Sequence, residues 1–391
     1  MSRFRDRWTI AALFGGLLLA AVDAQMLIPL LGRLEADYGT SVEGMGRLFS
    51  VYALTAGGFN LLVGPFTDRW GRLPFLRAGL AVFALLSLAT HFSQGYLQLL
   101  WLRAGTGAAS GLISTCTAGL VGDIFPYRRR GRVMGIVLSA YFVALIVGVP
   151  AGTWIADRWQ WRAVFLASCL LASAVLASLW GPLSGFRSGA PDGGRIRFAY
   201  RRFFSARPLR NALLVSFAVA GGTMALMVYL SGYLIGRFGV TPIQISWLFV
   251  VAGIAAVTGS LISGWVVDRW TKRKVFLLAN LAFILAISGL TSMPWGAGLI
   301  GLFFAVSLCV SFRQTALQTL QTQLVGIDER GSYLALRNCF SQLGIAVVVL
   351  VSGWCYSWSG YGAVVLLVGL LSAAAGVLFF LSVQEPRGSA R

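Results

Sequence analysis

The feature that most constrains this chain is a succession of apolar runs, each about 20 residues long. A run of that length crosses a bilayer as a helix, because a helix satisfies its own backbone polar groups. Hydrophobic residues make up 57% of the 391 and charged residues only 12%, whereas a soluble domain carries about a quarter. The sequence therefore predicts an all-α polytopic membrane protein. We place twelve helices near residues 9–31, 45–66, 74–93, 96–121, 133–156, 161–181, 210–234, 243–266, 274–293, 297–325, 334–356 and 359–383.

Positive charge is distributed unequally over the loops between these helices. About 25 of the 32 Lys and Arg residues fall at the two termini, in the loops after even-numbered helices and in a central segment. The opposite loops carry Arg33, Arg47, Arg158, Arg162 and Arg237. Because basic loops stay in the cytoplasm, we expect a multi-pass protein of a bacterial-type cytoplasmic (inner) membrane with both termini inside. This topology explains the formal charge of +19, and we expect no nucleic-acid partner.

A charged turn occurs twice, half a chain apart. The first is Gly64-Pro65-Phe66-Thr67-Asp68-Arg69-Trp70-Gly71-Arg72, and the second spans residues 263–274. The two aspartates, Asp68 and Asp268, are separated by 268 − 68 = 200 residues. A repeat at half the chain length is typical of transporters built from two homologous halves. We therefore predict six-helix bundles at 1–182 and 210–391, joined by a basic cytoplasmic linker at 183–209.

The motifs, taken in order, resemble the major facilitator superfamily. The first turn matches the signature loop G-x-x-x-D-R-x-G-R, and the second is a degraded copy with Thr271 in place of Gly71. Residues 102–109 resemble the embedded arginine motif of helix 4. The helix 5 motif of the twelve-helix drug and sugar (arabinose-efflux-like) proton antiporters is matched at Gly148, Pro150 and Gly152. The resemblance implies the major facilitator fold, two pseudo-symmetric six-helix bundles that work by alternating access.

We interpret the charged turns as a cytoplasmic gate. Asp68 follows the second helix, where Arg69, Arg72 and the end of the fourth helix at Asp123 could be close. A charged cluster of this kind can hold helix ends together in one conformation and separate in the other. The alternative is that the arginines only set topology. The residues assigned to the gate are Gly64, Asp68, Arg69, Gly71, Arg72, Asp123, Asp268, Arg269 and Arg273.

Three charged residues, Asp23, Arg103 and Arg313, lie inside apolar helices. Each costs about 2.5–3.5 kcal/mol or more at the bilayer centre, so each indicates function. Asp23 falls near the middle of its helix, where a carboxylate could bind and release a proton during transport, with Arg103 as its partner. A static buried ion pair is the alternative reading. The resemblance to proton antiporters favours proton coupling.

The tenth helix carries a wide polar face. At 100° per residue, Gln314, Gln318 and Gln321 share one stripe and Arg313 points to a different side. A polar face in a spanning helix is expected to line a cavity, although amides can also hold helices together. The residues that we expect around a substrate cavity are Arg313, Gln314, Gln318, Gln321, Asn60, Tyr141 and Gln25.

The sequence shows no nucleotide-binding loop, catalytic triad or metal-type cysteine spacing. We therefore expect no enzyme activity, catalytic residue, cofactor or metal. The favoured function is proton-coupled efflux of a small organic molecule, with substrate and protons as the partners and a monomer in the bilayer. Two alternatives remain. One is an exchanger or importer of an anionic substrate bound by Arg103 and Arg313, and the other is a non-transporting membrane receptor or scaffold.

Overall fold

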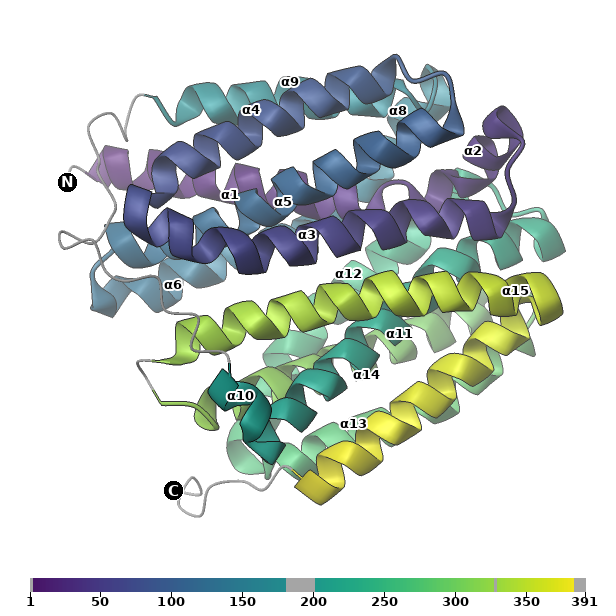
Figure 1. The fold of residues 1–391 in the computed structure, drawn as a ribbon. Coiled ribbons are helices and arrows are strands. Elements are labelled where there is room, and N and C mark those ends of the chain that lie inside the picture. Colours follow the sequence, from purple (N-terminus) through teal and green to yellow (C-terminus); the bar gives the residue numbers. More distant parts are fainter. Residues whose placement is uncertain (1–2, 181–200, 327–328, 383–391) are drawn as a thin grey trace. The chain divides into compact units, whose positions relative to one another are not determined.

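The computed structural model describes residues 3–180, 201–326 and 329–382, and these residues form helices joined by short turns (Figure 1). They pack as two compact units. Unit 1 comprises Met1–Tyr38 and Val51–Arg197, and unit 2 comprises Gly39–Ser50 and Phe198–Arg391. No strand occurs in the described ranges, as expected for a chain that must satisfy its backbone inside a bilayer.

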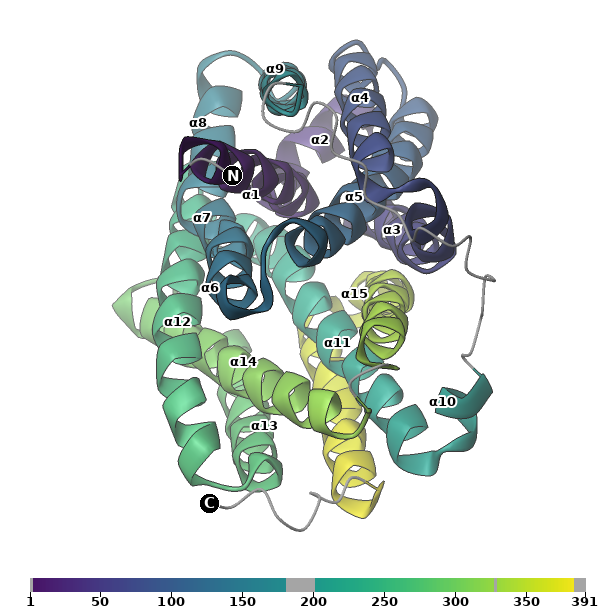
Figure 2. The same ribbon diagram turned by 90° about the vertical axis from the view of Figure 1, so that its left-hand side faces the viewer.

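Most of the first half of the chain lies in unit 1, although α3 begins within the Gly39–Ser50 segment of unit 2. The helices of this half are α1 (Arg3–Gln25), α2 (Leu31–Tyr38), α3 (Val42–Trp70), α4 (Arg72–His91), α5 (Tyr96–Ile124), α6 (Tyr127–Leu138), α7 (Ala140–Val143), α8 (Val149–Arg158) and α9 (Ala163–Ser178). A 3₁₀ turn at Ile28–Leu30, with Pro29 in it, separates α1 from α2. A π-helical turn at Ala144–Gly148 separates α7 from α8, just ahead of Pro150. Figure 2 shows α1 among α5, α6, α7 and α9, which it contacts.

Unit 2 repeats this layout. Its helices are α10 (Arg201–Ser205), α11 (Arg207–Phe238), α12 (Pro242–Arg269), α13 (Lys272–Ser288), α14 (Ala297–Gln323) and α15 (Arg330–Ser382). A capping box between Thr241 and Gln244, with Pro242 in the first turn, fixes the start of α12. The long α15 breaks at Ser359 and Gly360, whose backbones are not helical, so it makes two spans. In the core, α11 packs along α15 and α12 along α14.

The prediction of a twelve-span, all-α polytopic membrane protein is confirmed. Eight helical segments of the described residues are long and apolar enough to cross a membrane, and α15 is one of them. Its break divides α15 into two spans, and α3, α5 and α9 supply the remaining three. The first span begins earlier than expected, at Arg3, and reaches Tyr38 through the turn at Ile28–Leu30. Part of the predicted linker, residues 183–200, lies outside the described residues.

Candidate functional site

The interior of unit 1 holds an ion pair between α1 and α5. Arg103 Nη1 donates to both carboxylate oxygens of Asp23, at 2.9 and 3.0 Å, and Nη2 donates to the Asp23 carbonyl at 3.3 Å. Both side chains are at most 1% exposed. A single buried charge would be strongly unfavourable here, so each side chain serves as the counter-charge of the other inside the bundle.

Aromatic and hydroxyl groups surround this pair. The ring of Tyr52 on α3 lies 4.3 Å from the Arg103 guanidinium, and the Tyr52 hydroxyl donates to Ser110 Oγ at 2.7 Å. Arg103 Nε has no hydrogen-bond partner among the described residues. The guanidinium is therefore held by Asp23 and a ring face, and the loss of the Asp23 charge would leave it without a counter-ion.

The helix 5 motif lies beside the pair. A Cβ built on Gly148 would come within 2.2 Å of the Val22 side chain, and one on Gly152 would contact Val164 and Met26. Pro150 sits in the first turn of α8, after the π-helical turn. Proline cannot donate the usual backbone bond, and π-turns are frequent at functional sites. The sequence motif thus lets α8 approach α1 next to Asp23.

Unit 2 buries a second arginine, Arg313 of α14, at 0% exposure. Its Nη1 donates to Asn280 Oδ1 at 3.1 Å and to Ser372 Oγ at 3.4 Å. Its Nη2 donates to Thr223 Oγ1 at 3.2 Å, and the guanidinium lies 3.6 Å from the centre of the Phe283 ring. In the described part of the chain no carboxylate forms an ion pair with it, and Nε has no hydrogen-bond partner there. Neutral acceptors and a ring face surround this cation.

The two buried arginines contact positions that correspond in the repeat. Thr223 follows Asp23 by 223 − 23 = 200 residues, which equals the spacing of Asp68 and Asp268. Arg103 therefore meets an acid on the first span of its half, and Arg313 meets a hydroxyl there. The halves differ by one negative charge at this position. Our sequence reasoning missed Thr223, Asn280 and Ser372, although the 200-residue repeat was a signal for Thr223.

The glutamines of α14 separate into two environments. Gln314 and Gln318 are exposed, whereas Gln321 is buried. Gln321 Nε2 donates to the Ala212 carbonyl at 2.9 Å and to Ser216 Oγ at 2.7 Å, which ties α14 to α11. The stripe thus contains one amide that joins helices and two that lie on a surface of unit 2.

The other expected cavity residues are spread through unit 1. Asn60 of α3 is 9% exposed, and its Oδ1 accepts from Thr115 Oγ1 of α5 at 2.7 Å. Tyr141 of α7 is 44% exposed. Gln25 is the last residue of α1 and is partly buried. Asn60 therefore joins two helices, whereas Tyr141 lies at the surface.

The first charged turn ties α4 to α5. Arg72 Nη1 donates to Asp123 Oδ1 at 2.6 Å and to the Gly119 carbonyl at 3.0 Å. Gly71 has φ +89°, a conformation that favours glycine, so a single residue separates α3 from α4. Gly64 lies within α3, and the Arg69 guanidinium is 5.9 Å from the Trp70 ring centre. The Asp68 side chain lies outside the described residues.

The second charged turn is built differently. Thr271 has φ −65°, so this turn does not use the left-handed conformation of Gly71. The Arg269 guanidinium lies 4.0 Å from the Trp265 ring centre, and Asp268 is exposed. Arg273 lies 4.4 Å from the Phe380 ring centre and donates to the Phe380 carbonyl. The second motif therefore has no need of a glycine at position 271, because its backbone turns differently there.

Comparison with known proteins places this architecture in a family. The model described as Major Facilitator Superfamily matches residues 13–241 and 212–391. An uncharacterized MFS-type transporter, YwfA of Bacillus subtilis (strain 168), is 28% identical over 95% of this chain and 90% of its own length. The gallate transporter of Pseudomonas putida is 26% identical, with 88% of this chain and 84% of the relative covered.

A solved structure has the same fold. The crystal structure of a D-xylose-proton symporter superposes with a TM-score of 0.79 at 16% identity, covering 97% of this chain and 98% of that chain. The family match extends over both halves of the chain, including the turns, the buried Asp23–Arg103 pair and Arg313. The protein therefore belongs to the major facilitator superfamily of membrane transporters.

Proposed function

We propose that the protein exports a small organic molecule in exchange for protons, by alternating access, across a bacterial-type cytoplasmic membrane. The observation that carries this proposal is the buried Asp23–Arg103 pair. Replacing a buried ion pair by apolar residues is often neutral or stabilising, so stability alone gives little reason for two charges in this bundle. A carboxylate whose counter-ion lies 2.9 Å away can exist in two states, ionised and paired or protonated and released.

The change between these two states of Asp23 would couple proton binding to the movement of helices. Protonation of Asp23 removes the attraction that joins α1 to α5 and frees the guanidinium of Arg103. Deprotonation restores the pair. A proton gradient supplies about 1.4 kcal/mol per pH unit, enough to bias a two-state equilibrium tenfold. Gly148 packs closely against Val22, the neighbour of Asp23 in α1. A shift of α1 on protonation of Asp23 would therefore also displace α8.

The topology that we propose has both termini in the cytoplasm, as the distribution of basic loops indicates. In that orientation the Arg72–Asp123 pair lies at the cytoplasmic end of unit 1 and acts as part of a gate. It is 27–29% exposed, so it contributes modestly to stability and can break and re-form during a cycle.

Everted membrane vesicles provide the test. A panel of labelled drugs, sugars, amino acids and organic anions is offered with and without an imposed pH gradient, acidic inside. We expect the gradient to drive accumulation of at least one compound and Asp23→Asn to abolish that accumulation. Arg33→Gln, which removes an exposed pair with Asp157 in the same unit, is the control and should transport normally. Equal accumulation without the gradient, or by Asp23→Asn with the gradient, would refute proton coupling.

A second candidate is the transport of an organic anion that is held by Arg313. The supporting observation is that only neutral partners surround this cation in the described residues. The Pseudomonas putida relative is named for gallate, which is an organic anion. Thr223→Asp tests this candidate. The Arg313 guanidinium lies 3.2 Å from Thr223 Oγ1, so a carboxylate introduced there would compete with an anionic substrate for Arg313. Anion transport should fall in Thr223→Asp and persist in Thr223→Asn. Equal anion transport by both variants would contradict a role for Arg313.

A further inference from the structure

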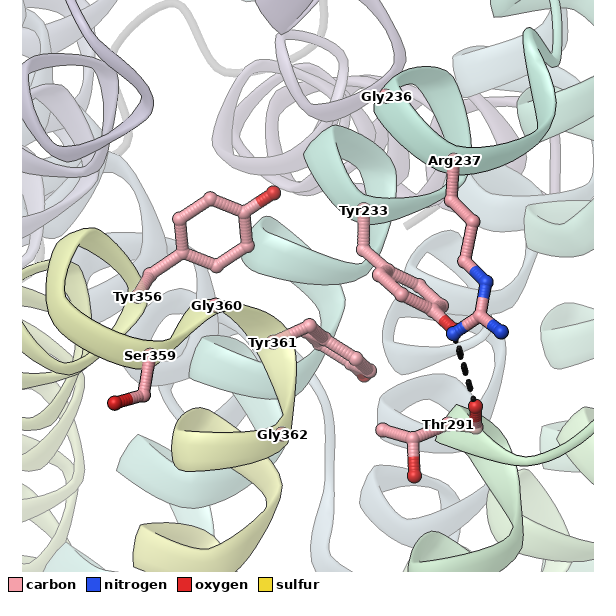
Figure 3. A pocket seen from close by; sticks show the side chains of 9 residues that line it. All are labelled: Tyr233, Gly236, Arg237, Thr291, Tyr356, Ser359, Gly360, Tyr361 and Gly362. Atoms are coloured by element: carbon pink, nitrogen blue, oxygen red, sulfur yellow. Dashed lines mark hydrogen bonds between the residues drawn. The ribbon is translucent and has the colours of Figure 1, made fainter.

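Unit 2 contains a cavity of about 490 Å³. It lies where α11 ends, where the 3₁₀ turn Gly289–Thr291 follows α13, and where α15 breaks (Figure 3). Its lining residues are Tyr233, Gly236, Arg237, Thr291, Tyr356, Ser359, Gly360, Tyr361 and Gly362. The volume falls in the range of small-molecule sites. None of the residues around Asp23 or Arg313 belongs to it.

Tyrosine rings form the walls of this cavity. Tyr233 and Tyr361 stack with ring centres 4.9 Å apart and an interplanar angle of 19°. Tyr361 is only 2% exposed, and its hydroxyl donates to the Leu226 carbonyl at 3.3 Å. Tyr356 stacks on Tyr229 with ring centres 5.5 Å apart, and it stands across from Tyr233 in Figure 3. The rings are thus held in place before any ligand arrives.

The same cavity carries one fixed positive charge. Arg237 Nη1 donates to the Tyr233 hydroxyl at 2.8 Å and to the Thr291 carbonyl at 3.3 Å. The described residues provide no acceptor for Nη2 or Nε, so that side of the guanidinium is available to a ligand. None of the nine lining residues is acidic. A carboxylate is the complementary group, since it can accept two parallel hydrogen bonds from a guanidinium.

Tyrosine and arginine are also common at membrane interfaces, where they act as anchors towards lipid. Anchors of that kind spread singly around the outside of a bundle. Here three tyrosines from two helices line one cavity, and the arginine is positioned by a hydroxyl and a carbonyl. Gly360, with φ +68°, lets α15 turn sharply enough to bring Tyr356 and Tyr361 to the same cavity.

We propose that this cavity is a binding site for a small aromatic carboxylate. The ligand ring would lie against Tyr356, Tyr233 and Tyr361, and its carboxylate would take the free side of Arg237. The cavity is formed by unit 2 residues alone, so the site does not require proton coupling at Asp23. Ligand binding at this cavity can therefore be measured without any transport at the Asp23–Arg103 pair.

Benzoate is the probe. The purified full-length protein is placed in nanodiscs of zwitterionic lipid, and binding is measured by calorimetry and saturation-transfer NMR without any gradient. We expect saturable binding with a Kd below about 10 mM. Benzamide, which lacks the charge, and cyclohexanecarboxylate, which lacks the aromatic face, should each bind more weakly. Phenyltrimethylammonium should not compete because its charge has the wrong sign.

Variants locate the bound ligand. Arg237→Gln should weaken benzoate binding about tenfold, because a charge-assisted contact is lost. Tyr356→Leu should weaken benzoate about threefold to tenfold while changing cyclohexanecarboxylate less. Arg210→Gln removes the same charge from an exposed position at the opposite end of α11 and should leave the Kd unchanged. Thermal unfolding of each variant confirms that the fold is intact.

The site is refuted by any of three results. The first is an absence of saturable benzoate binding to the wild-type protein. The second is an equal Kd for the wild type and the folded Arg237→Gln variant. The third is an equal loss in Arg210→Gln, which would indicate a general effect of charge. Because none of these measurements uses transport, their outcome is independent of the vesicle experiment.

Discussion

Removing one partner of the buried ion pair should destabilise unit 1 strongly. Asp23→Asn leaves the Arg103 guanidinium at 0% exposure without a counter-charge, and Arg103→Gln leaves the carboxylate in the same position. Breaking a buried pair in this way costs about 3–5 kcal/mol. For a unit of this size, a loss of that magnitude lowers Tm by about 6–20 °C.

The double variant distinguishes pairing from simple packing. Asp23→Asn with Arg103→Gln removes both charges and keeps similar side-chain volumes, so its Tm should return most of the way to the wild-type value. The assay is thermal unfolding in one detergent for the wild type, both single variants and the double variant. Arg33→Gln, whose partner Asp157 is 41% exposed, should shift Tm by only about 3 °C or less.

Additive losses in Tm would contradict a coupled ion pair. If the Tm losses of the two single variants simply add in the double variant, the side chains act independently and no coupled pair exists. Single-variant losses no larger than that of Arg33→Gln would show that the pair is solvated rather than buried. Either result would also remove the observation on which proton coupling depends.

Three further predictions concern the gate and the second arginine. Gly119→Ala would place a Cβ 2.4 Å from Arg72 Cδ, so the Arg72–Asp123 pair should break and the transport rate should fall. The control is Gly122→Ala, where an added Cβ meets nothing within 4 Å. Equal transport rates for the two variants would contradict the gate. Thr223→Asp should be about 1–3 kcal/mol more stable than Thr223→Asn, because its carboxylate can pair with the Arg313 guanidinium. A lower Tm for Thr223→Asp than for Thr223→Asn would contradict an unpaired positive charge at Arg313. Asp68→Asn should reduce vesicle transport more than Asp268→Asn, because only the first turn keeps the complete motif; the reverse order would count against an asymmetric gate.

The fold was predictable because its signals are long and repeated. Apolar runs of bilayer length determine the spans, and the recurrence of Asp68 at Asp268 indicates two halves. The break within α15 was expected between residues 356 and 359, close to the observed Ser359 and Gly360. The extension of the first span to Tyr38 was less visible, because Pro29 interrupts it without ending it.

The site was harder to predict because helical periodicity does not reveal partners. It places Gln314, Gln318 and Gln321 on one stripe, yet only contacts with α11 show that Gln321 is buried. Arg313 was visible as a charge in an apolar run, but its neutral partners come from three other helices. The cavity beside Arg237 depends on a bend in α15 and on ring stacking, which no spacing in the sequence specifies.

A measurement of proton movement during substrate transport tests directly whether Asp23 couples the two. Proteoliposomes that contain a pH-sensitive dye are given the compound identified in the vesicle panel, and the internal pH is followed. We expect a substrate-dependent pH change with the wild-type protein. We expect no such change with a folded Asp23→Asn variant, even where that variant still exchanges labelled for unlabelled substrate. An undiminished pH change with Asp23→Asn would show that Asp23 and Arg103 do not couple transport to protons.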